Sequence, residues 1–326
     1  MTVNTRKVLV AQSLSKAGMD ILKARGDIEV ISFQNAIKPA DFHPMLADAE
    51  GVILGLTPVK APEVAVAPKL KVAARIGVGY DTVDVAALTP KKIALMIAGT
   101  ANSPSVAEQA FSMMFHLAKR NQQNDSSVRS GQWRDNLSIF PSDLFEKTLL
   151  VIGFGRIGSR TAKRGVAFEM RTLVYDPYVS QDAIKAAGCV PVTDLDAAVK
   201  EADFISVHCP KNPETVNLFD AKRIALMKPT AILINTARGG IVHEQALADA
   251  LNAEKIAGAG VDVFEVEPAP VDHPLLKAKN CVVAPHLAGV TKESLDRMSI
   301  AAAKNVLSVF DGKPNRENAI NPEVFD

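Results

Sequence analysis

The chain has 326 residues, of which 48% are hydrophobic, and its formal net charge at pH 7 is +1. This length is comfortable for two domains and long for a single core. The balanced charge excludes bulk electrostatic attraction to nucleic acid or to an anionic membrane, and no apolar run reaches the length of a transmembrane helix. We therefore expect two globular domains, with neither a nucleic-acid nor a membrane partner.

The three cysteines, Cys189, Cys209 and Cys281, are odd in number and widely spaced. They form no CxxC pair, so the sequence supports neither a disulfide framework nor a metal site. Near the N-terminus only the short apolar run VLVA precedes polar residues, which fits a first strand better than a signal peptide. We predict a cytoplasmic protein that holds no metal.

Short β-rich runs alternate with helical stretches over the first hundred residues. The expected strands are KVLVA (7–11), IEVISF (28–33), GVILGL (51–56), VAARIGV (72–78) and IALMIAG (93–99). Helical segments such as residues 16–26 lie between them. Strands that alternate with helices predict an α/β domain built on a parallel sheet.

Residues 103–120 carry apolar side chains at helical spacing. Ser105 and Glu108 have the spacing of a capping box, which predicts that the helix starts near Ser105. Met113 and Met114 fit core packing better than contact with a cofactor. We expect one long buried helix here.

The segment TLLVIGFGRIG (148–158) runs an apolar strand into a glycine-rich turn. Gly153 permits the tight turn, Gly155 lets the backbone approach a pyrophosphate, and Gly158 allows the next helix to pack closely on the strand. Asp176, 21 residues after Gly155, closes the following strand. A carboxylate at this separation reaches the ribose hydroxyls and repels a 2′-phosphate, so we predict NAD as the cofactor.

Polar side chains follow the last strands of this half. The strands expected after the glycine-rich turn are RTLVYD (171–176), DFISVHCP (203–210), AILINTA (231–237), AGAGVDV (257–263) and CVVAPH (281–286). Arg238, Glu267 and His286 each come just beyond one of them, at the sheet edge where open parallel sheets bind ligands. They offer a cation for a carboxylate, a carboxylate for an imidazole, and an imidazole for proton transfer.

From about residue 50 to residue 300 the chain resembles the D-isomer-specific 2-hydroxyacid dehydrogenase family, in particular its phosphoglycerate dehydrogenase-like and hydroxypyruvate reductase-like members. The matching motifs are RIGVGYDTVD (75–84), GFGRIG (153–158), the block around Arg238, Glu267 before Pro268, and PHLAG (285–289). The resemblance implies two Rossmann-like α/β domains, one flavodoxin-like and one NAD-binding, with an active-site cleft between them. It places a discontinuous catalytic domain at 1–100 plus 293–326 and the NAD-binding domain, which supplies a homodimer interface, at 101–292.

The resemblance also implies roles for the site residues. Arg238 would grip the carboxylate of a 2-keto acid and polarise its ketone, helped by the backbone amides of Val78 and Gly79. His286 would protonate the developing alkoxide while NADH delivers hydride, and Glu267 would stabilise the imidazolium. Leu56 and Thr57 would face the substrate side chain.

The same resemblance assigns a cofactor-binding set, in which His208 lines the NAD site and Asp262 contacts the nicotinamide amide. The full set is Val106, Gly153, Gly155, Arg156, Ile157, Gly158, Asp176, His208, Cys209, Pro210, Thr236, Ala237, Asp262, His286, Ala288 and Gly289.

Two positions bear on the substrate. Formate dehydrogenases resemble this family but tend to carry glutamine where Glu267 stands, so a hydroxy acid is favoured over formate. Phosphoglycerate dehydrogenases tend to carry arginine where Gly55 stands, and only Lys60 is a nearby cation, so 3-phosphohydroxypyruvate is disfavoured. We favour glyoxylate or hydroxypyruvate.

Other functions stay open. Sulfopyruvate is an alternative substrate, because PHLAGVTKES (285–294) also looks like the corresponding stretch of sulfolactate dehydrogenases. An NADH-sensing protein of the corepressor kind is an alternative of another class, since such proteins resemble the same fold. The segment 130–147, which holds the only tryptophan, Trp133, is expected to pack across the dimer, or else to anchor within its own chain.

Overall fold

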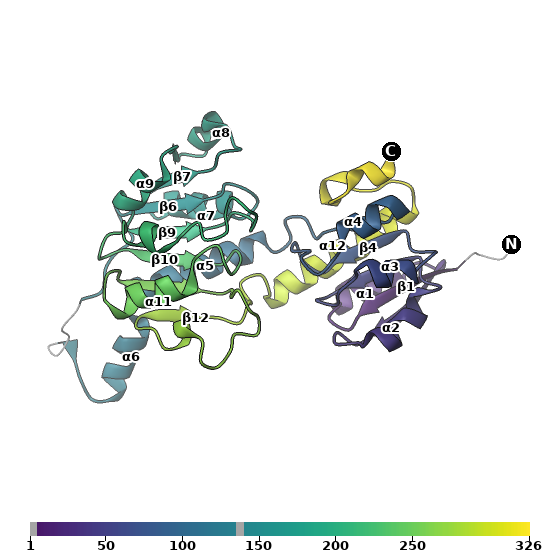
Figure 1. The fold of residues 1–326 in the computed structure, drawn as a ribbon, viewed down its shortest axis with the longest axis horizontal. Helices are drawn as coiled ribbons and strands as arrows, with labels where there is room; N and C mark the ends of the chain where they lie inside the picture. Colours follow the sequence, from purple (N-terminus) through teal and green to yellow (C-terminus); the bar gives the residue numbers. More distant parts are fainter. Residues whose placement is uncertain (1–4, 135–139) are drawn as a thin grey trace. The chain divides into compact units, whose positions relative to one another are not determined.

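The computed structural model describes residues 5–134 and 140–326 (Figure 1). The chain divides into two compact units: unit 1 comprises Met1–Asn102 and Gly289–Asp326, and unit 2 comprises Ser103–Ala288. Each unit is built on one parallel sheet, which confirms the predicted class of two α/β units. No helix in the described part of the chain has the length and hydropathy needed to cross a membrane.

Unit 1 contains a five-stranded sheet in the order β2-β1-β3-β4-β5, the flavodoxin-like order. Its strands are β1 (Arg6–Ala11), β2 (Ile28–Phe33), β3 (Gly51–Leu54), β4 (Val72–Arg75) and β5 (Ala94–Met96). All neighbouring strands pair in parallel. The expected strands are therefore present, and β3, β4 and β5 end before Gly55, Gly77 and Gly99, which lie at or near the ends of the predicted runs.

Helices cover both faces of this sheet. They are α1 (Lys16–Lys23), α2 (Pro39–Leu46), α3 (Ala61–Ala65), α4 (Val85–Leu88) and α12 (Lys292–Phe310), with short 3₁₀ turns at Thr89–Lys91, Arg316–Asn318 and Pro322–Phe325. One core contains Phe42 and Leu46 of α2 against the sheet. The other contains Ala302 and Val306 of α12 against Val8 and Ile53. The returning helix α12 thus completes the core of unit 1.

Unit 2 contains a seven-stranded parallel sheet in the order β12-β11-β10-β9-β6-β7-β8. Its strands are β6 (Thr148–Ile152), β7 (Arg171–Tyr175), β8 (Val190–Pro191), β9 (Phe204–Val207), β10 (Ile232–Asn235), β11 (Gly258–Val261) and β12 (Cys281–Val283). The chain order reverses between β6 and β9, and open sheets of this kind bind dinucleotides at that point. The short edge strand β8 was not predicted, because only two residues pair there.

The helices of unit 2 are α5 (Ser103–Ala118), α6 (Asn121–Arg129), α7 (Gly158–Ala167), α8 (Gln181–Ala186), α9 (Leu195–Glu201), α10 (Ala221–Ile224) and α11 (Glu244–Asn252), with a 3₁₀ turn at Pro274–Leu276. Met113 and Met114 of α5 are buried in the core, as predicted. Figure 1 shows α6 at the periphery of this unit.

The predicted capping box at Ser105 is wrong. Helix α5 begins at Ser103, and Ser105 lies inside it with its side chain buried. Pro104 explains the earlier start, because a proline in the first turn of a helix gives up no helical hydrogen bond. Glu108, the other half of the expected box, accepts from Nη2 of Arg164 on α7 at 3.0 Å.

Candidate active site

The glycine-rich turn between β6 and α7 places its three glycines in different surroundings. Gly153 has a φ of 89°, in the left-handed region, and a Cβ there would lie 2.8 Å from the amide nitrogen of Cys209. A Cβ on Gly158 would lie 1.8 Å from the carbonyl oxygen of Gly153. A Cβ on Gly155 would meet no heavy atom within 4 Å. The fold itself therefore requires Gly153 and Gly158, whereas Gly155 leaves an open surface on which a pyrophosphate fits.

Asp176 lies beside this turn, just after β7. Its Oδ2 accepts from the amide of Phe154 at 2.7 Å, and its Oδ1 accepts from the amide of Tyr178 at 2.8 Å. Two backbone donors therefore fix the carboxylate next to the glycine-rich turn. This position fits the predicted contact with the ribose hydroxyls of NAD.

The segment after β9, the strand next to β6, forms another side of this region. His208 Nε2 is hydrogen-bonded to the Ser206 hydroxyl at 2.8 Å, and its buried Nδ1 has no partner among the described residues. Burial lowers the pKa of His208 to about 3 and raises the pKa of the Cys209 thiol to about 11. Thr236, after β10, likewise has a buried hydroxyl without a partner in the described structure. Uncharged polar groups at this edge fit a bound dinucleotide.

The other residues of the predicted cofactor set lie in several environments. Val106 is buried in α5, Ile157 precedes the first turn of α7, and Arg156 is exposed. Pro210 is exposed after β9, Ala237 is half-buried after β10, and Ala288 is buried. Gly289 is the first residue of the second segment of unit 1.

His286 and Glu267 form a hydrogen-bonded pair in unit 2. The distance from His286 Nδ1 to Glu267 Oε2 is 2.7 Å, and the amide of Phe264 donates to Glu267 Oε1 at 3.0 Å. Both carboxylate oxygens therefore have donors. The His286 side chain is 45% exposed, and its Nε2 remains the ring atom available for proton transfer to a ligand.

Asp262 holds the backbone that carries His286. Its carboxylate accepts from the amides of Leu287 and Ala288, both at 2.9 Å, and its carbonyl accepts from the His286 amide at 2.7 Å. Burial raises the pKa of Asp262, while the two amides act in the opposite direction. These contacts fix His286 in a left-handed conformation with a φ of 55°. The expected contact of Asp262 with nicotinamide stays a prediction.

Arg238 follows β10, and the buried side chain of Asn235 shapes its turn. Asn235 Nδ2 donates to the Arg238 carbonyl at 2.9 Å, and Asn235 Oδ1 accepts from the Ala237 amide at 3.1 Å. Arg238 Nη1 in turn donates to the Ala237 carbonyl at 2.8 Å. Sequence reasoning missed Asn235, although an amide side chain at the end of the buried run ILIN was the available signal.

The Arg238 turn packs directly on the loop that leads to Glu267. A Cβ on Gly239 would lie 1.9 Å from the carbonyl carbon of Phe264, so only glycine fits at this position. Phe264 is also the residue whose amide holds Glu267. Unit 2 therefore brings the loops of Arg238, Glu267 and His286 into one connected group at the carboxyl edge of the sheet.

The predicted substrate-binding residues of unit 1 follow β3 and β4. Within the described residues, the amides of Val78 and Gly79 donate to no backbone acceptor. Arg75, a buried residue that sequence reasoning missed, donates from Nε to the Gly79 carbonyl at 2.9 Å and so shapes this loop. Two adjacent amides with no backbone acceptor are suited to an anion.

The turn after β3 exposes Leu56, of which 76% is accessible, while Thr57 is buried and donates its hydroxyl to the Asn35 carbonyl at 2.9 Å. Gly55 lies beside them. A Cβ on Gly55 would be 2.7 Å from the Ser13 hydroxyl oxygen, so a larger residue requires Ser13 to move. At this turn Leu56 is therefore the side chain presented to solvent.

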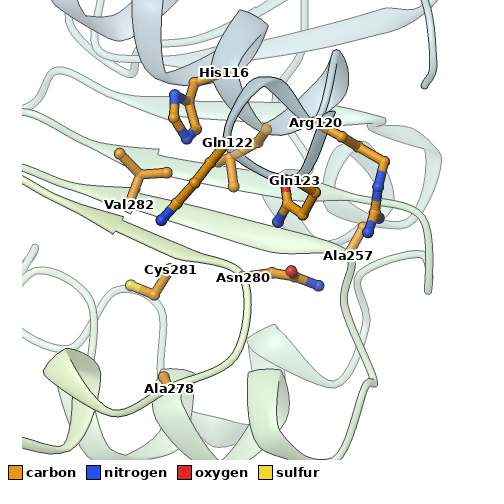
Figure 2. A pocket seen from close by; sticks show the side chains of 10 residues that line it. His116, Arg120, Gln122, Gln123, Ala257, Ala278, Asn280, Cys281 and Val282 are labelled. Carbon is orange, nitrogen blue, oxygen red and sulfur yellow. The ribbon is translucent and has the colours of Figure 1, made fainter. Parts of the chain in front are cut away.

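Figure 2 shows a separate pocket of about 210 Å³ in unit 2. Its polar lining includes His116 of α5, Arg120 between α5 and α6, Gln122 and Gln123 of α6, Asn280 just before β12, and Cys281, the first residue of β12. Because β12 is parallel to its neighbours, this pocket lies at the amino edge of the sheet, opposite His286. Among the described residues, no group of three or more histidine, cysteine or carboxylate side chains is arranged to hold a metal ion.

The comparisons with known proteins agree with this geometry. Residues 111–288 match the family model "D-isomer specific 2-hydroxyacid dehydrogenase, NAD binding domain". D-3-phosphoglycerate dehydrogenase of Synechocystis is 36% identical over 98% of this chain, but the chain spans only 58% of that relative's length. A crystal structure from Thermus thermophilus superimposes with a TM-score of 0.87 at 32% identity, covering 96% of this chain and 99% of the other.

A second solved structure was determined with ligands. D-lactate dehydrogenase from Aquifex aeolicus, described as complexed with NAD and lactic acid, has a TM-score of 0.82 at 31% identity and covers 96% of this chain and 99% of its own. The fold and site thus define a dinucleotide-binding protein of the two-unit α/β dehydrogenase class. More particularly, the chain belongs to the D-isomer-specific 2-hydroxyacid dehydrogenase family of NAD-dependent oxidoreductases. The predicted family is confirmed, and the part of this chain that matches the family model is its NAD-binding domain.

Proposed function

We propose that this protein catalyses the NAD-dependent interconversion of a small 2-keto acid and the corresponding D-2-hydroxy acid. The observation that carries the proposal is the 2.7 Å hydrogen bond between His286 and Glu267 at the carboxyl edge of the dinucleotide-binding sheet. An imidazole oriented by a carboxylate transfers a proton to or from an alcohol oxygen near neutral pH. Arg238, in the adjoining turn, supplies the cation that a carboxylate substrate requires.

Each residue has a separate part in the reaction. NADH, which Asp176 and the glycine-rich turn at Gly155 would hold, would supply the hydride for the keto carbon. Arg238 binds the substrate carboxylate and polarises the neighbouring ketone through its guanidinium group. His286 Nε2 donates a proton to the ketone oxygen, and the Glu267 carboxylate stabilises the positive charge that His286 carries before transfer. In the oxidative direction Nε2 accepts the proton from the hydroxyl group.

The preferred substrate is a small acid such as glyoxylate or hydroxypyruvate. A phosphate group requires cations, and the turn after β3 offers the exposed Leu56 and a glycine at position 55. The name of the Synechocystis relative supports 3-phosphohydroxypyruvate as the second candidate. Sulfopyruvate is the third candidate, because residues 285–294 look like the corresponding stretch of sulfolactate dehydrogenases. That the amides of Val78 and Gly79 bind the same carboxylate stays a prediction.

A substrate screen tests the proposal. NADH oxidation by the purified protein is measured with glyoxylate, hydroxypyruvate, sulfopyruvate, pyruvate and 3-phosphohydroxypyruvate. We expect the highest kcat/KM with glyoxylate or hydroxypyruvate. A preference for the phosphorylated acid would overturn the substrate assignment and keep the enzyme class. Tight NADH binding without turnover of any acid would favour the sensor alternative.

We also propose that the protein forms a homodimer through α6 and the segment after it. Helix α6 has no buried residue, and exposed apolar side chains lie near its end and in the segment that follows it: Val128, Trp133, Phe140 and Phe145. An apolar surface of this kind is typical of an interface. Residues 135–139 of this segment lie outside the described residues.

Cytoplasmic location stays a prediction, supported by three cysteines that are not in disulfides.

Sedimentation velocity tests the dimer. The unchanged protein is expected to sediment as a dimer, and the double variant Trp133→Ser, Phe140→Ser as a monomer at the same concentration. A dimer that persists in the double variant would assign the interface elsewhere, and a monomeric unchanged protein would refute the proposal.

A further inference from the structure

Unit 2 contains a second histidine–carboxylate pair, which is connected to the candidate catalytic pair. His273 Nε2 is 2.8 Å from Glu244 Oε2, and the two side chains are only 10% and 13% exposed. Glu244 is the first residue of α11, where the positive end of the helix dipole also favours a carboxylate. Nothing in the mechanism above uses either residue.

The hydrogen bonds fix the protonation pattern of this pair. The amide of Leu275 donates to His273 Nδ1 at 3.3 Å, so Nδ1 is an acceptor and the ring proton resides on Nε2. His273 therefore donates to Glu244 as a neutral imidazole. The second oxygen of Glu244, Oε1, accepts from the backbone amide of Glu265 at 2.6 Å. Every polar atom of the two side chains thus has a partner.

This network holds the backbone that orients Glu267. The peptide group of residues 264 and 265 is bound by Glu244 on its amide side and contacts Gly239 on its other side. The ring of Phe264 packs edge-on against His273 with 5.2 Å between centroids. The amide of Phe264 donates to Glu267, which in turn binds His286. A chain of direct contacts therefore joins His273 to the proton-transfer imidazole.

We propose that Glu244 and His273 are positioning residues that fix the loop 264–265 and thereby hold the Glu267 carboxylate on His286 Nδ1. The proposal rests on the proposed function for its kinetic consequence. Neither residue touches the substrate or the cofactor in this scheme. They act through backbone geometry, and a shift of Glu267 by about 1 Å is enough to lower a rate by up to a hundredfold.

The kinetic test compares Glu244→Ala with Glu244→Gln. Alanine removes both hydrogen bonds of the carboxylate, whereas glutamine retains an oxygen that accepts from Glu265. We expect kcat to fall about tenfold to a hundredfold in Glu244→Ala, with KM changed less than about twofold because Asn235 still holds the Arg238 turn. Glu244→Gln is expected to recover part of kcat. His273→Leu is expected to resemble Glu244→Ala, and His273→Gln, which retains a donor, to recover part of kcat.

A matched control comes from unit 1, where His43 Nε2 lies 2.9 Å from Glu63 Oε1. His43→Gln changes a comparable histidine–glutamate contact of unit 1, which is not part of the network described for the loop 264–265. Its kcat, KM and pH profile are expected to equal those of the unchanged protein. All rates are divided by the amount of protein that binds NADH, so that loss of folded protein does not count as loss of kcat.

A spectroscopic readout separates the positioning role from the proposed activity. The His286 imidazole is followed by NMR during a pH titration, with its signals assigned from a His286→Gln variant. The Glu267 carboxylate binds its Nδ1, and the Asp262 carboxyl group interacts with it electrostatically. In Glu244→Ala we expect His286 to lose its proton at lower pH than in the unchanged protein. The Glu267→Gln variant is expected to change the titration of His286 in the same direction.

The outcomes are distinct. If Glu244→Ala and His273→Leu keep the unchanged kcat and the unchanged His286 titration, the positioning role is refuted. If either variant fails to fold, Glu244→Gln and His273→Gln decide by the same two readouts. If the unchanged protein turns over none of the acids, the proposed function fails, and the NMR titration still tests the positioning role.

Discussion

At the scale of single residues, the site separates groups that act on the ligand from groups that hold them. Glu267 uses one oxygen for the Phe264 amide and the other for His286, so its orientation is set before any ligand binds. Asp262 fixes the left-handed turn at His286 by binding the two amides that follow. Preorganisation of this kind lowers the cost of reaching the reactive geometry.

The first prediction concerns the charge of Glu267. Glu267→Gln retains an oxygen for the Phe264 amide but removes the negative charge that stabilises a protonated His286. We expect kcat for keto-acid reduction to fall about a hundredfold, with KM changed only a few fold, because general acid catalysis contributes about this much. Steady-state kinetics with the best acid of the screen measures it. Glu265→Gln, two residues away with an exposed side chain, is the control and is expected to keep kcat. An equal loss in both variants would contradict the assigned role.

At the scale of elements, the turn between β6 and α7 combines a requirement of the fold with a requirement of the ligand. Gly158 is needed because a Cβ at this position would overlap the Gly153 carbonyl. The lack of a side chain lets the helix α7 pack closely on the strand β6. Gly155 has no such neighbour, so its lack of a side chain has no explanation in packing. The pyrophosphate predicted to bind at this turn would explain it.

The second prediction follows from this difference. Gly155→Ala is expected to unfold at the temperature of the unchanged protein and to bind NADH at least about tenfold more weakly, because the methyl group occupies the path of the pyrophosphate. Gly158→Ala is expected to be strongly destabilised, since overlap with backbone cannot be relieved by a rotamer change. Isothermal titration calorimetry and thermal unfolding measure the two effects. Normal NADH affinity in Gly155→Ala would exclude the pyrophosphate from this turn.

The elements themselves were largely predictable from the sequence. Strands such as TLLVI, the run of β6, are buried and β-branched or apolar throughout, and helices with polar faces separate them. The start of α5 was misjudged because Ser105 and Glu108 fit a capping box while Pro104 fits a first helical turn. The tertiary fold selected the second pattern.

The site was predictable only in part, for a physical reason. Arg238, Glu267 and His286 follow strands, and parallel strands bring such positions to one edge. Glu244 and His273 are 29 residues apart, and their contact arises from how α11 packs on the loops. The contact between Gly239 and Phe264 likewise arises from tertiary structure, and no local sequence pattern predicts it.

At the scale of the whole molecule, the chain first forms all five strands of unit 1, then forms the whole of unit 2, and returns to unit 1 with α12. Unit 1 is completed by α12, which donates apolar side chains to a core begun by β1 and β3. Ser299 on this helix accepts from the Ser15 amide at 3.0 Å, and a Cβ on Gly18 would lie 2.7 Å from the Ser299 carbonyl oxygen. The first and last segments of the chain are therefore parts of one packed body.

The stability of the whole molecule should depend on pH through His208, whose pKa burial lowers to about 3. An unfolded chain would bind a proton at this imidazole near pH 6.5, whereas the folded protein would not. The folded-state pKa is thus depressed. The associated stability is present above about pH 6.5 and is lost as the pH falls toward 3, with a slope of about 1.4 kcal/mol per pH unit.

His208→Gln tests this dependence, because glutamine fills similar space and does not titrate. Between pH 6.5 and pH 5, the unchanged protein is expected to lose about 2 kcal/mol more free energy of unfolding than the variant. Urea unfolding followed by circular dichroism at the two pH values measures the difference. Burial raises the pKa of Asp203, but Lys228 and the Thr148 amide lower it further, so that the pKa lies below its ordinary value. Carboxylates of this kind contribute equally to both proteins and cancel in the comparison. His116→Gln is the control and should retain the full dependence. A His208→Gln variant that retains it as well would mean that His208 is protonated in the folded protein within this range.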